Sequence, residues 1–134
     1  MGSVPVILLD THVLVWTVAE PERLSRAALA AIRKARSEDG VAISAISVWE
    51  LAVLIARGRI QVYGNVEDSV RKLVEGVVIK PITPEIAALG TQFPDDYPRD
   101  PADRLIGATA RTEGLSLITH DARIRSSPLV VTVW

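Results

Sequence analysis

Short apolar runs alternate with longer segments of mixed polarity along the whole chain. The first run, residues 4–9, carries only apolar side chains, which is typical of a central strand buried on both faces of its sheet. Pro5 can lie only near the start of this strand, because proline has no N–H for the strand ladder. The pattern predicts five strands in all, at residues 4–9, 41–43, 77–79, 115–118 and 130–133.

Cap residues mark where the segments between these runs begin as helices. Ser25, Asn65 and Thr83 each precede such a segment, and their side-chain oxygens can accept a hydrogen bond from the first helical turn. Asp100 followed by Pro101 places proline at the first helical position, which the fixed φ of proline favours. The predicted helices cover residues 26–36, 66–75, 84–91 and 101–113, with one more that opens at Ser44 or Ser47 and runs to Arg57.

Strands that alternate with helices predict βαβ units, and therefore a parallel sheet covered by helices on both faces. A chain of 134 residues has the length of one domain with one core, and we expect residues 1–134 to form that domain. Ligands of such sheets bind beyond the carboxyl ends of the strands. The side chains that follow the strands are therefore the first candidates for a functional site.

Four acidic residues are expected at this edge of the sheet. Asp10 directly follows the first strand, and Asp121 lies three residues beyond the fourth. Glu50 and Asp103 lie in the first turns of helices whose N-termini emerge at the same edge. Two carboxylates about 4 Å apart repel by roughly 4 kcal/mol even at an effective dielectric of about 20. Four together must take up protons or bind a hard cation such as Mg²⁺ or Mn²⁺, so the pattern predicts metal-dependent phosphoryl chemistry.

Each acid also has a purely structural interpretation. Ser47 and Glu50 have the spacing of a capping box, in which the glutamate bonds back to the N–H of the cap residue. Asp103 lies where the helix dipole stabilises an acid, and Asp10 and Asp121 are placed as turn residues are. The functional interpretation rests on the coincidence of all four acids at one edge.

Two histidines adjoin these acids in the sequence. His12 and His120 lie beside Asp10 and Asp121, which allows either acid–base chemistry or a structural role for each ring. No serine is accompanied by the His and Asp of a nucleophilic triad, and the chain has no glycine-rich phosphate loop of the Walker or Rossmann type.

The amino-acid composition indicates the compartment and the partners to expect for this protein. The chain has no cysteine, which excludes disulfides and thiolate metal sites and suits a reducing cytosol. The longest apolar runs are too short to span a bilayer, and residues 1–10 lack the basic start of a signal peptide, so we expect a cytoplasmic protein without membrane partners. The net charge of −1 provides no general attraction to nucleic acid, although most of the 15 basic residues are Arg, which suits bidentate phosphate contacts.

The sequence around the acids resembles the PIN-domain ribonucleases, and within them the VapC toxins of type II toxin–antitoxin pairs. The resemblance extends over nearly the whole chain and is carried by four motifs in the same order at similar separations. They are LDTH at residues 9–12 with Trp16 downstream, ISAISVWE at 43–50, RDPADRLI at 99–106 and LITHD at 117–121. Ala102 stands where similar toxins often carry Phe, and His120 stands where many carry Arg.

The resemblance implies a PIN-like α/β fold, a three-layer α/β/α sandwich on a central parallel sheet of about five strands. It implies that Asp10, Glu50, Asp103 and Asp121 form a catalytic quartet that binds Mg²⁺ or Mn²⁺, with Asp10 and Asp103 as the principal ligands. Asp100 is either a fifth contributor or only the cap of its helix.

Three neighbours of the acids, Thr11, His12 and Arg104, are auxiliary candidates. Arg104 is expected either to offset phosphate charge, as Arg99 and Arg123 also could, or to pair with a neighbouring carboxylate.

The implied reaction is hydrolysis of an RNA phosphodiester by metal-activated water. The resemblance also implies a homodimer and a small antitoxin whose C-terminal segment lies over the active-site groove. Transfer RNA, ribosomal RNA and messenger RNA are all open as the substrate, because the choice depends on groove shape and unpaired bases.

Three other functions stay open at the level of sequence. One is a PIN nuclease of RNA processing without a toxin role. A second is a phosphohydrolase with Asp10 as nucleophile, which normally carries a second Asp two positions later, where this chain has His12. The third is a binding module with an inactive site, in which the acids are only caps and turn residues.

Overall fold

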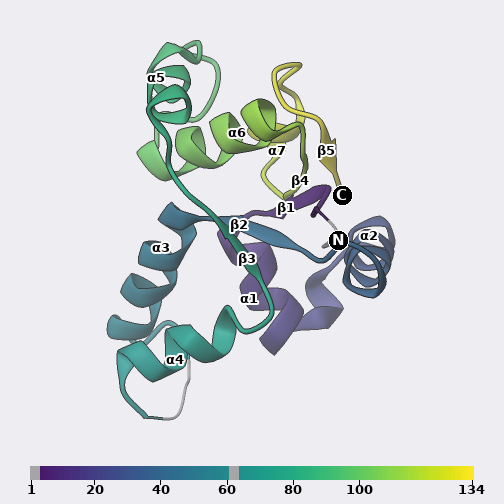
Figure 1. The fold of residues 1–134 in the computed structure, drawn as a ribbon, viewed down its shortest axis with the longest axis vertical. Helices are drawn as coiled ribbons and strands as arrows, with labels where there is room; N and C mark the ends of the chain where they lie inside the picture. The colour runs from purple at the N-terminus through teal and green to yellow at the C-terminus, as the bar shows by residue number, and fades with distance from the viewer. Residues whose placement is uncertain (1–3, 61–63) are drawn as a thin grey trace.

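Five parallel strands form the sheet at the centre of the molecule, in the order β3-β2-β1-β4-β5 (Figure 1). The computed structural model describes residues 4–60 and 64–134. Leu8 of the central strand pairs with Ala42 on one side and with Leu117 on the other. The predicted five-stranded parallel sheet is confirmed. Its strands are β1 (Ile7–Leu9), β2 (Ala42–Ser44), β3 (Val78–Lys80), β4 (Ser116–Ile118) and β5 (Thr132–Val133).

Strands β1, β4 and β5 are shorter than the apolar runs predicted, whereas β2 and β3 keep the predicted length and begin one residue later. Val4 and Val6, both expected in the first strand, are 68% and 55% exposed, and β1 begins only at Ile7. The neighbouring strands pair with Ile7–Leu9, and just before this range the Val6 carbonyl still accepts the N–H of Ser116 in β4 at 3.1 Å, so the ladder ends at Val6. An apolar run therefore locates a strand, whereas its partners decide how long it is.

The predicted helix caps are confirmed. The side-chain oxygens of Ser25, Asn65 and Thr83 each accept a hydrogen bond from the backbone N–H three residues later, at 3.0, 2.8 and 3.2 Å. Gly114 ends its helix in the left-handed region at φ +68°, which a residue without a Cβ adopts at little cost. The helices are α1 (Thr11–Ala19), α2 (Arg26–Ser37), α3 (Ala45–Ala56), α4 (Val66–Leu73), α5 (Pro84–Gln92), α6 (Pro101–Glu113) and α7 (Ala122–Arg125), with a 3₁₀ turn η1 (Pro21–Arg23).

Helices α1 and α7 have no counterpart among the predicted elements. Helix α1 carries apolar residues nearly all round, so its sequence lacks the apolar stripe by which an amphipathic helix is recognised. Helix α7 is only 4 residues long and is defined mainly by its cap, Asp121. Both helices begin directly at a candidate site residue, since Asp10 is the cap of α1.

Alternate residues of the central strand face two separate cores. Ile7 and Leu9 lie in a cluster with Leu14, Ile32 and Leu51 from the helices of one face, α1, α2 and α3. Leu8, which points the other way, lies in a second cluster, whose main helical members are Ile86, Ile106 and Ile124 of α5, α6 and α7.

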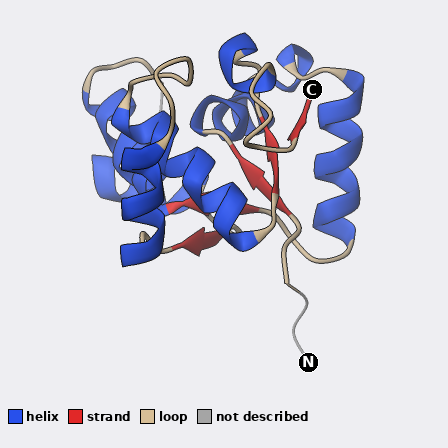
Figure 2. Cartoon of the chain, turned by 90° about the horizontal axis from the view of Figure 1, so that it is seen from above, coloured by secondary structure: helices blue, strands red, loops and turns tan. Residues whose placement is uncertain are grey.

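The strands therefore lie between two helical layers, which confirms the predicted three-layer α/β/α sandwich (Figure 2). Among the residues that the structure describes, no helix combines the length and apolar character needed to cross a membrane.

Candidate active site

Asp10 lies at the carboxyl end of the central strand, where its carboxylate is held from two sides. Its backbone N–H donates to the Ile118 carbonyl at 3.0 Å and thus extends the contact between β1 and β4. Its Oδ1 accepts the Thr11 N–H at 2.8 Å, which caps α1, and its Oδ2 accepts the Thr119 hydroxyl at 2.8 Å. Burial raises the pKa of Asp10, and the bonds from Thr119 and Thr11 oppose that rise. Hydrogen bonds thus fix the position of the Asp10 carboxylate, but they do not fully offset the cost of burying its negative charge.

Thr119 connects two of the acids. Its side chain is fully buried at the end of β4, and its hydroxyl accepts the Asp121 N–H at 3.1 Å while donating to Asp10. Thr119 was not among the site residues expected from the sequence. The sequence does contain a signal for it. Thr119 directly follows the apolar strand residues Leu117 and Ile118, and a polar side chain just past the end of a parallel strand lies at the edge where ligands bind.

Glu50 is held by Thr11 rather than by a capping box. Thr11 Oγ1 lies 2.5 Å from Glu50 Oε1 and 2.8 Å from Ser47 Oγ. A hydroxyl has one proton, so Thr11 donates to the carboxylate and the Ser47 hydroxyl donates to Thr11. The cap of α3 is Ser44, whose Oγ accepts the Ile46 N–H at 3.3 Å, so the capping-box interpretation of Ser47 and Glu50 is wrong.

The pKa of Glu50 is raised as well. The largest cause is burial, and the charges of Asp10 and Asp100 add to it, while the bond from Thr11 lowers it. Thr11 therefore serves two acids at once, because its N–H binds Asp10 and its hydroxyl binds Glu50.

Helix α6 brings Asp103 to the same edge. Asp100 caps this helix, since its Oδ1 accepts the N–H groups of Ala102 and Asp103 at 2.8 and 3.3 Å. The Asp103 carboxylate receives no hydrogen bond from any residue that the structure describes. Burial is the largest cause that raises the pKa of Asp103, and the charges of Asp10, Asp100, Asp121 and Glu50 add to it in that order, so that the pKa reaches about 7. Of the two interpretations of Asp100, the cap is confirmed, and its charge acts on Asp103 and Glu50 from outside the pocket.

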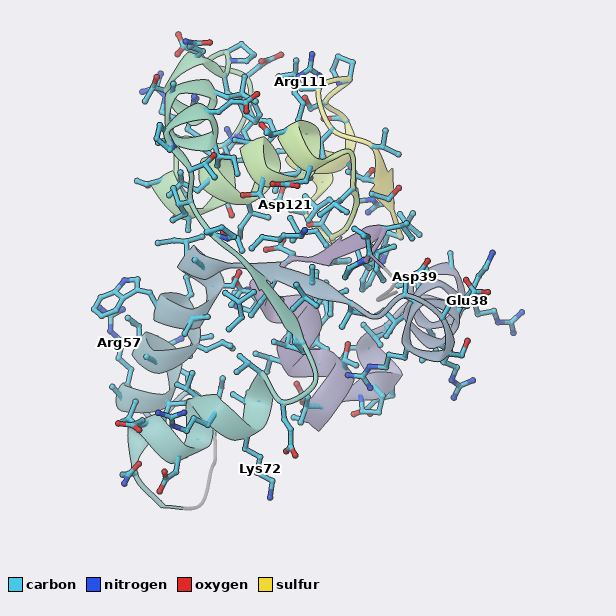
Figure 3. The ribbon with its side chains drawn as sticks, in the orientation of Figure 1. Glu38, Asp39, Arg57, Lys72, Arg111 and Asp121 are labelled. Atoms are coloured by element: carbon cyan, nitrogen blue, oxygen red, sulfur yellow. The ribbon has the colours of Figure 1, made fainter. Side chains whose placement is uncertain are left out.

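The four acids line one pocket of about 160 Å³. Asp121 caps α7 with Oδ1, which accepts the N–H groups of Arg123 and Ile124 at 2.9 and 3.1 Å. In Figure 3, Glu38 and Lys72 project from the rim of the molecule, whereas Asp121 is drawn near the middle of the view; its side chain is partly buried. The predicted convergence of the acids is confirmed, and their catalytic role stays a prediction. The pocket is lined by Asp10, His12, Val13, Trp16, Glu50, Asp103, His120 and Asp121.

The donor set of this pocket fits a hard divalent cation. Its acids present only oxygen donors, and three of them, Asp10, Glu50 and Asp103, have raised pKa values that a bound cation would lower again. Within residues 4–60 and 64–134, no three acidic or histidine side chains are close enough together to enclose an ion as they stand. An ion such as Mg²⁺ keeps several of its waters and needs only one or two direct carboxylates, so three side chains in contact are not required for it.

The fold and the acid edge have counterparts among known proteins. The model of the PIN domain family matches residues 7–127. The chain belongs to the PIN-domain family. Ribonuclease VapC22 of Mycobacterium tuberculosis is 48% identical to this PIN domain over 130 residues, which cover 96% of this chain and 98% of that protein.

Solved structures of toxin–antitoxin proteins share the fold of this PIN domain. A toxin–antitoxin complex from Klebsiella pneumoniae is 25% identical with a TM-score of 0.65, and the match covers 94% of this chain and 96% of that one. VapBC2 of Rickettsia felis, solved with a DNA fragment from its promoter, has a TM-score of 0.71 at 14% identity, with the same coverage of 94% and 96%. The second likeness shows the fold alone.

Arg104 of this PIN domain is turned away from the acids. Its guanidinium group donates to the carbonyls of Pro98, Gly90, Phe93, Pro94 and Tyr97 at 2.7–3.5 Å. Arginine has five N–H donors, and all five are engaged. The expectation that Arg104 pairs with a neighbouring carboxylate is therefore wrong, because the backbone of residues 90–98 takes its whole donor set, whereas its role beside phosphate stays a prediction.

The raised pKa of Asp103 predicts that the metal-free PIN domain becomes less stable as the pH rises. An acid whose pKa is about 7 when folded and 3.8 ordinarily holds more protons in the folded state between those values, so unfolding becomes easier as the pH rises through them. Because solvent reaches part of Asp103, we expect a loss of about 1–2 kcal/mol between pH 4 and pH 7. Urea unfolding in EDTA at several pH values measures it.

Asp103→Asn is the matched variant for this prediction. The amide cannot ionise, so the variant should lose much of the slope and be the more stable protein above pH 7. Mg²⁺ should restore stability to the parent protein above pH 7 and have less effect on the variant. A parent protein whose stability rises between pH 4 and pH 7 by the same amount as that of the variant would contradict the prediction.

Proposed function

We propose that this PIN domain, residues 1–134, is a Mg²⁺- or Mn²⁺-dependent endoribonuclease and the toxin of a type II toxin–antitoxin pair. The observation that carries the proposal is the convergence of Asp10, Glu50, Asp103 and Asp121 on one pocket at the carboxyl edge of the sheet. The printed name of the 48% identical relative, a ribonuclease, supports the activity. The toxin–antitoxin complex that shares 25% identity supports the toxin role.

The four acids have different roles in the proposal, because their surroundings differ. Asp10 and Asp103 would be the principal ligands, since Asp10 is fixed by two hydrogen bonds and Asp103 has both carboxylate oxygens free of bonds from the described residues. Glu50 and Asp121 would hold metal-bound waters or a second ion. When bound, the cation would supply a water of lowered pKa as the nucleophile and would neutralise charge on the phosphate oxygens. Thr11 and Thr119 position carboxylates and touch no reacting atom.

An exposed apolar edge supports the partners of the proposal, a small antitoxin and a second copy of the chain. Val78 and Ile79 of the edge strand β3 are 41% and 44% exposed, and Ile82 just beyond it is 38% exposed. Natural proteins rarely leave an apolar edge strand uncovered, because it pairs readily with other chains. A cytoplasmic location is part of the same proposal.

Cleavage of total RNA by the purified protein, freed of any copurified partner, tests the activity. Incubation with Mg²⁺ or Mn²⁺ should give discrete fragments that are absent in EDTA, and their sequences name the class of RNA, with transfer RNA among the candidates. Intact RNA under all conditions, from a protein shown to be folded, would favour the binding module with an inactive site.

Growth of an expressing culture tests the toxin role separately. We expect expression to arrest growth and coexpression of a small partner protein encoded beside the toxin to relieve the arrest. Metal-dependent cleavage without growth arrest would instead favour a nuclease of RNA processing.

A further inference from the structure

A cluster of aromatic rings borders the acid pocket. The His120 ring lies 5.8 Å from the Trp16 ring and 5.1 Å from the Trp134 ring, and the two indoles are 5.9 Å apart, all three pairs being tilted edge to face. The rings come from α1, from the loop after β4 and from the end of the described chain after β5. Three distant segments therefore build one aromatic surface.

The members of this cluster differ in exposure. Trp16 and Trp134 are half-buried and pack against the core that includes Leu9 and Ile118, whereas His120 is exposed. Edge-to-face pairs at these separations are favourable, so the two indoles hold the imidazole in place. An exposed ring that is already ordered loses little side-chain entropy when a ligand stacks on it.

The position of His120 links this ring to the reaction site. His120 and Trp16 line the same pocket as Asp103 and Asp121. The Arg23 guanidinium lies 5.0 Å from the centre of the Trp16 ring, but it also pairs with the Glu20 carboxylate at 3.3 Å. An exposed ring beside a pocket of acids matches a nucleotide with its base on the ring and its reacting phosphate at the acids.

We propose that His120, held by Trp16 and Trp134, is the residue that stacks on an unpaired base next to the scissile phosphate. The inference rests on the proposed ribonuclease function and assigns a base-binding residue to its site. A base inside a duplex has both faces covered by its neighbours, whereas an unpaired base in a loop, bulge or end can turn out onto a protein ring. Stacking is tolerant of base identity, because every base has a π-face. His120 is thus a binding residue that acts through the plane of its ring.

Two substitutions separate stacking from proton transfer or phosphate binding by the imidazole. His120→Ala removes the ring, and His120→Phe keeps a ring but has no nitrogen to donate or accept. Both changes are made at an exposed position, so the fold should be kept. Trp49→Ala is the control, because Trp49 is an aromatic residue that is 65% exposed and lies outside the acid pocket.

Binding in EDTA, where no cleavage is expected, is the first readout. The probes are a short single-stranded oligoribonucleotide, the same oligonucleotide with abasic positions, and its duplex with a complementary strand. We expect His120→Ala to weaken binding of the single strand by about tenfold, and His120→Phe and Trp49→Ala to change it by less than about twofold. The abasic and duplex probes should bind the parent protein and His120→Ala alike.

Metal-dependent cleavage of the single strand is the second readout. His120→Ala should raise KM by about tenfold with kcat nearly unchanged, since stacking acts on bound substrate and transition state alike. Equal losses in His120→Phe and His120→Ala would overturn the inference, because they would assign the effect to the imidazole nitrogens. Unchanged binding and KM in His120→Ala would overturn it too.

The two readouts also separate this inference from the proposed function. A parent protein that cuts RNA while His120→Ala binds and cuts equally well keeps the function and removes the stacking site. A parent protein that cuts no RNA, yet shows the contrast between His120→Ala and His120→Phe in EDTA, keeps the stacking site and removes the nuclease.

Discussion

Asp10→Asn should abolish metal-dependent RNA cleavage while leaving the fold intact. The carboxylate of Asp10 lies in the acid pocket at the carboxyl end of the central strand, and we propose it, with Asp103, as a principal ligand of the ion. Loss of several kcal/mol of metal-based stabilisation in the transition state corresponds to about a 10³-fold loss of rate. Initial rates of cleavage at saturating Mg²⁺ or Mn²⁺ measure it.

Asparagine is the substitution that removes only the charge. It is as good a helix cap as aspartate, so its Oδ1 can still accept the Thr11 N–H, and the Thr119 hydroxyl can turn to accept from the new amide. Because burial raises the pKa of Asp10, the neutral side chain should leave the free energy of unfolding in EDTA unchanged or higher.

Asp95→Asn is the matched control, since Asp95 is an exposed acid outside the pocket. It should cleave RNA at the parent rate. If Asp10→Asn stayed within about tenfold of the parent rate, Asp10 would not be a principal ligand and the assignment of the site would be wrong.

Arg104→Met should lower the free energy of unfolding by about 3 kcal/mol. The guanidinium group of Arg104 binds five backbone carbonyls of the segment from Gly90 to Pro98, and the variant leaves these acceptors without their donors. The segment matters to the site, because the Tyr97 hydroxyl donates to the backbone carbonyl of Asp103 at 3.3 Å. Urea unfolding at constant pH measures the loss.

Two further arginine variants make this prediction specific. Arg104→Lys keeps the charge but has only three donors on a single nitrogen, so it should recover a minor part of the stability. Arg99→Met removes an exposed arginine nearby and should change stability by less than about 0.5 kcal/mol. A stable Arg104→Met that binds RNA poorly would show that Arg104 contacts phosphate after all.

Local sequence was sufficient to locate the strands and most helices. Residues such as Ser25, Asn65 and Thr83 cap helices through bonds that span three positions, so the signal lies within a few residues of the sequence. Helix α1 was not predicted, because apolar residues lie on nearly all of its sides and leave no polar face that would mark it as an amphipathic helix. The limits of β1 were missed because they depend on where β2 and β4 lie beside it.

The position of the four acids could likewise be predicted from the sequence, whereas their hydrogen-bond partners could not. The sequence alone placed Asp10 and Asp121 after strands and Glu50 and Asp103 at helix starts, and parallel topology then required that all four meet at one edge. This inference needed only the order of the elements, because a right-handed βαβ connection leaves few arrangements open.

Only the tertiary structure decided how each acid is held. Thr119 reaches Asp10 across 109 positions of sequence and Thr11 reaches Glu50 across 39, and no local pattern records such pairs. The orientation of Arg104 toward backbone carbonyls was likewise decided by the path of the loop before it. Helix caps and hydrophobic periodicity depend on residues close together in the sequence, so the sequence predicts them. The partner of a side chain, its burial and hence its pKa depend on segments that meet only when the chain has folded.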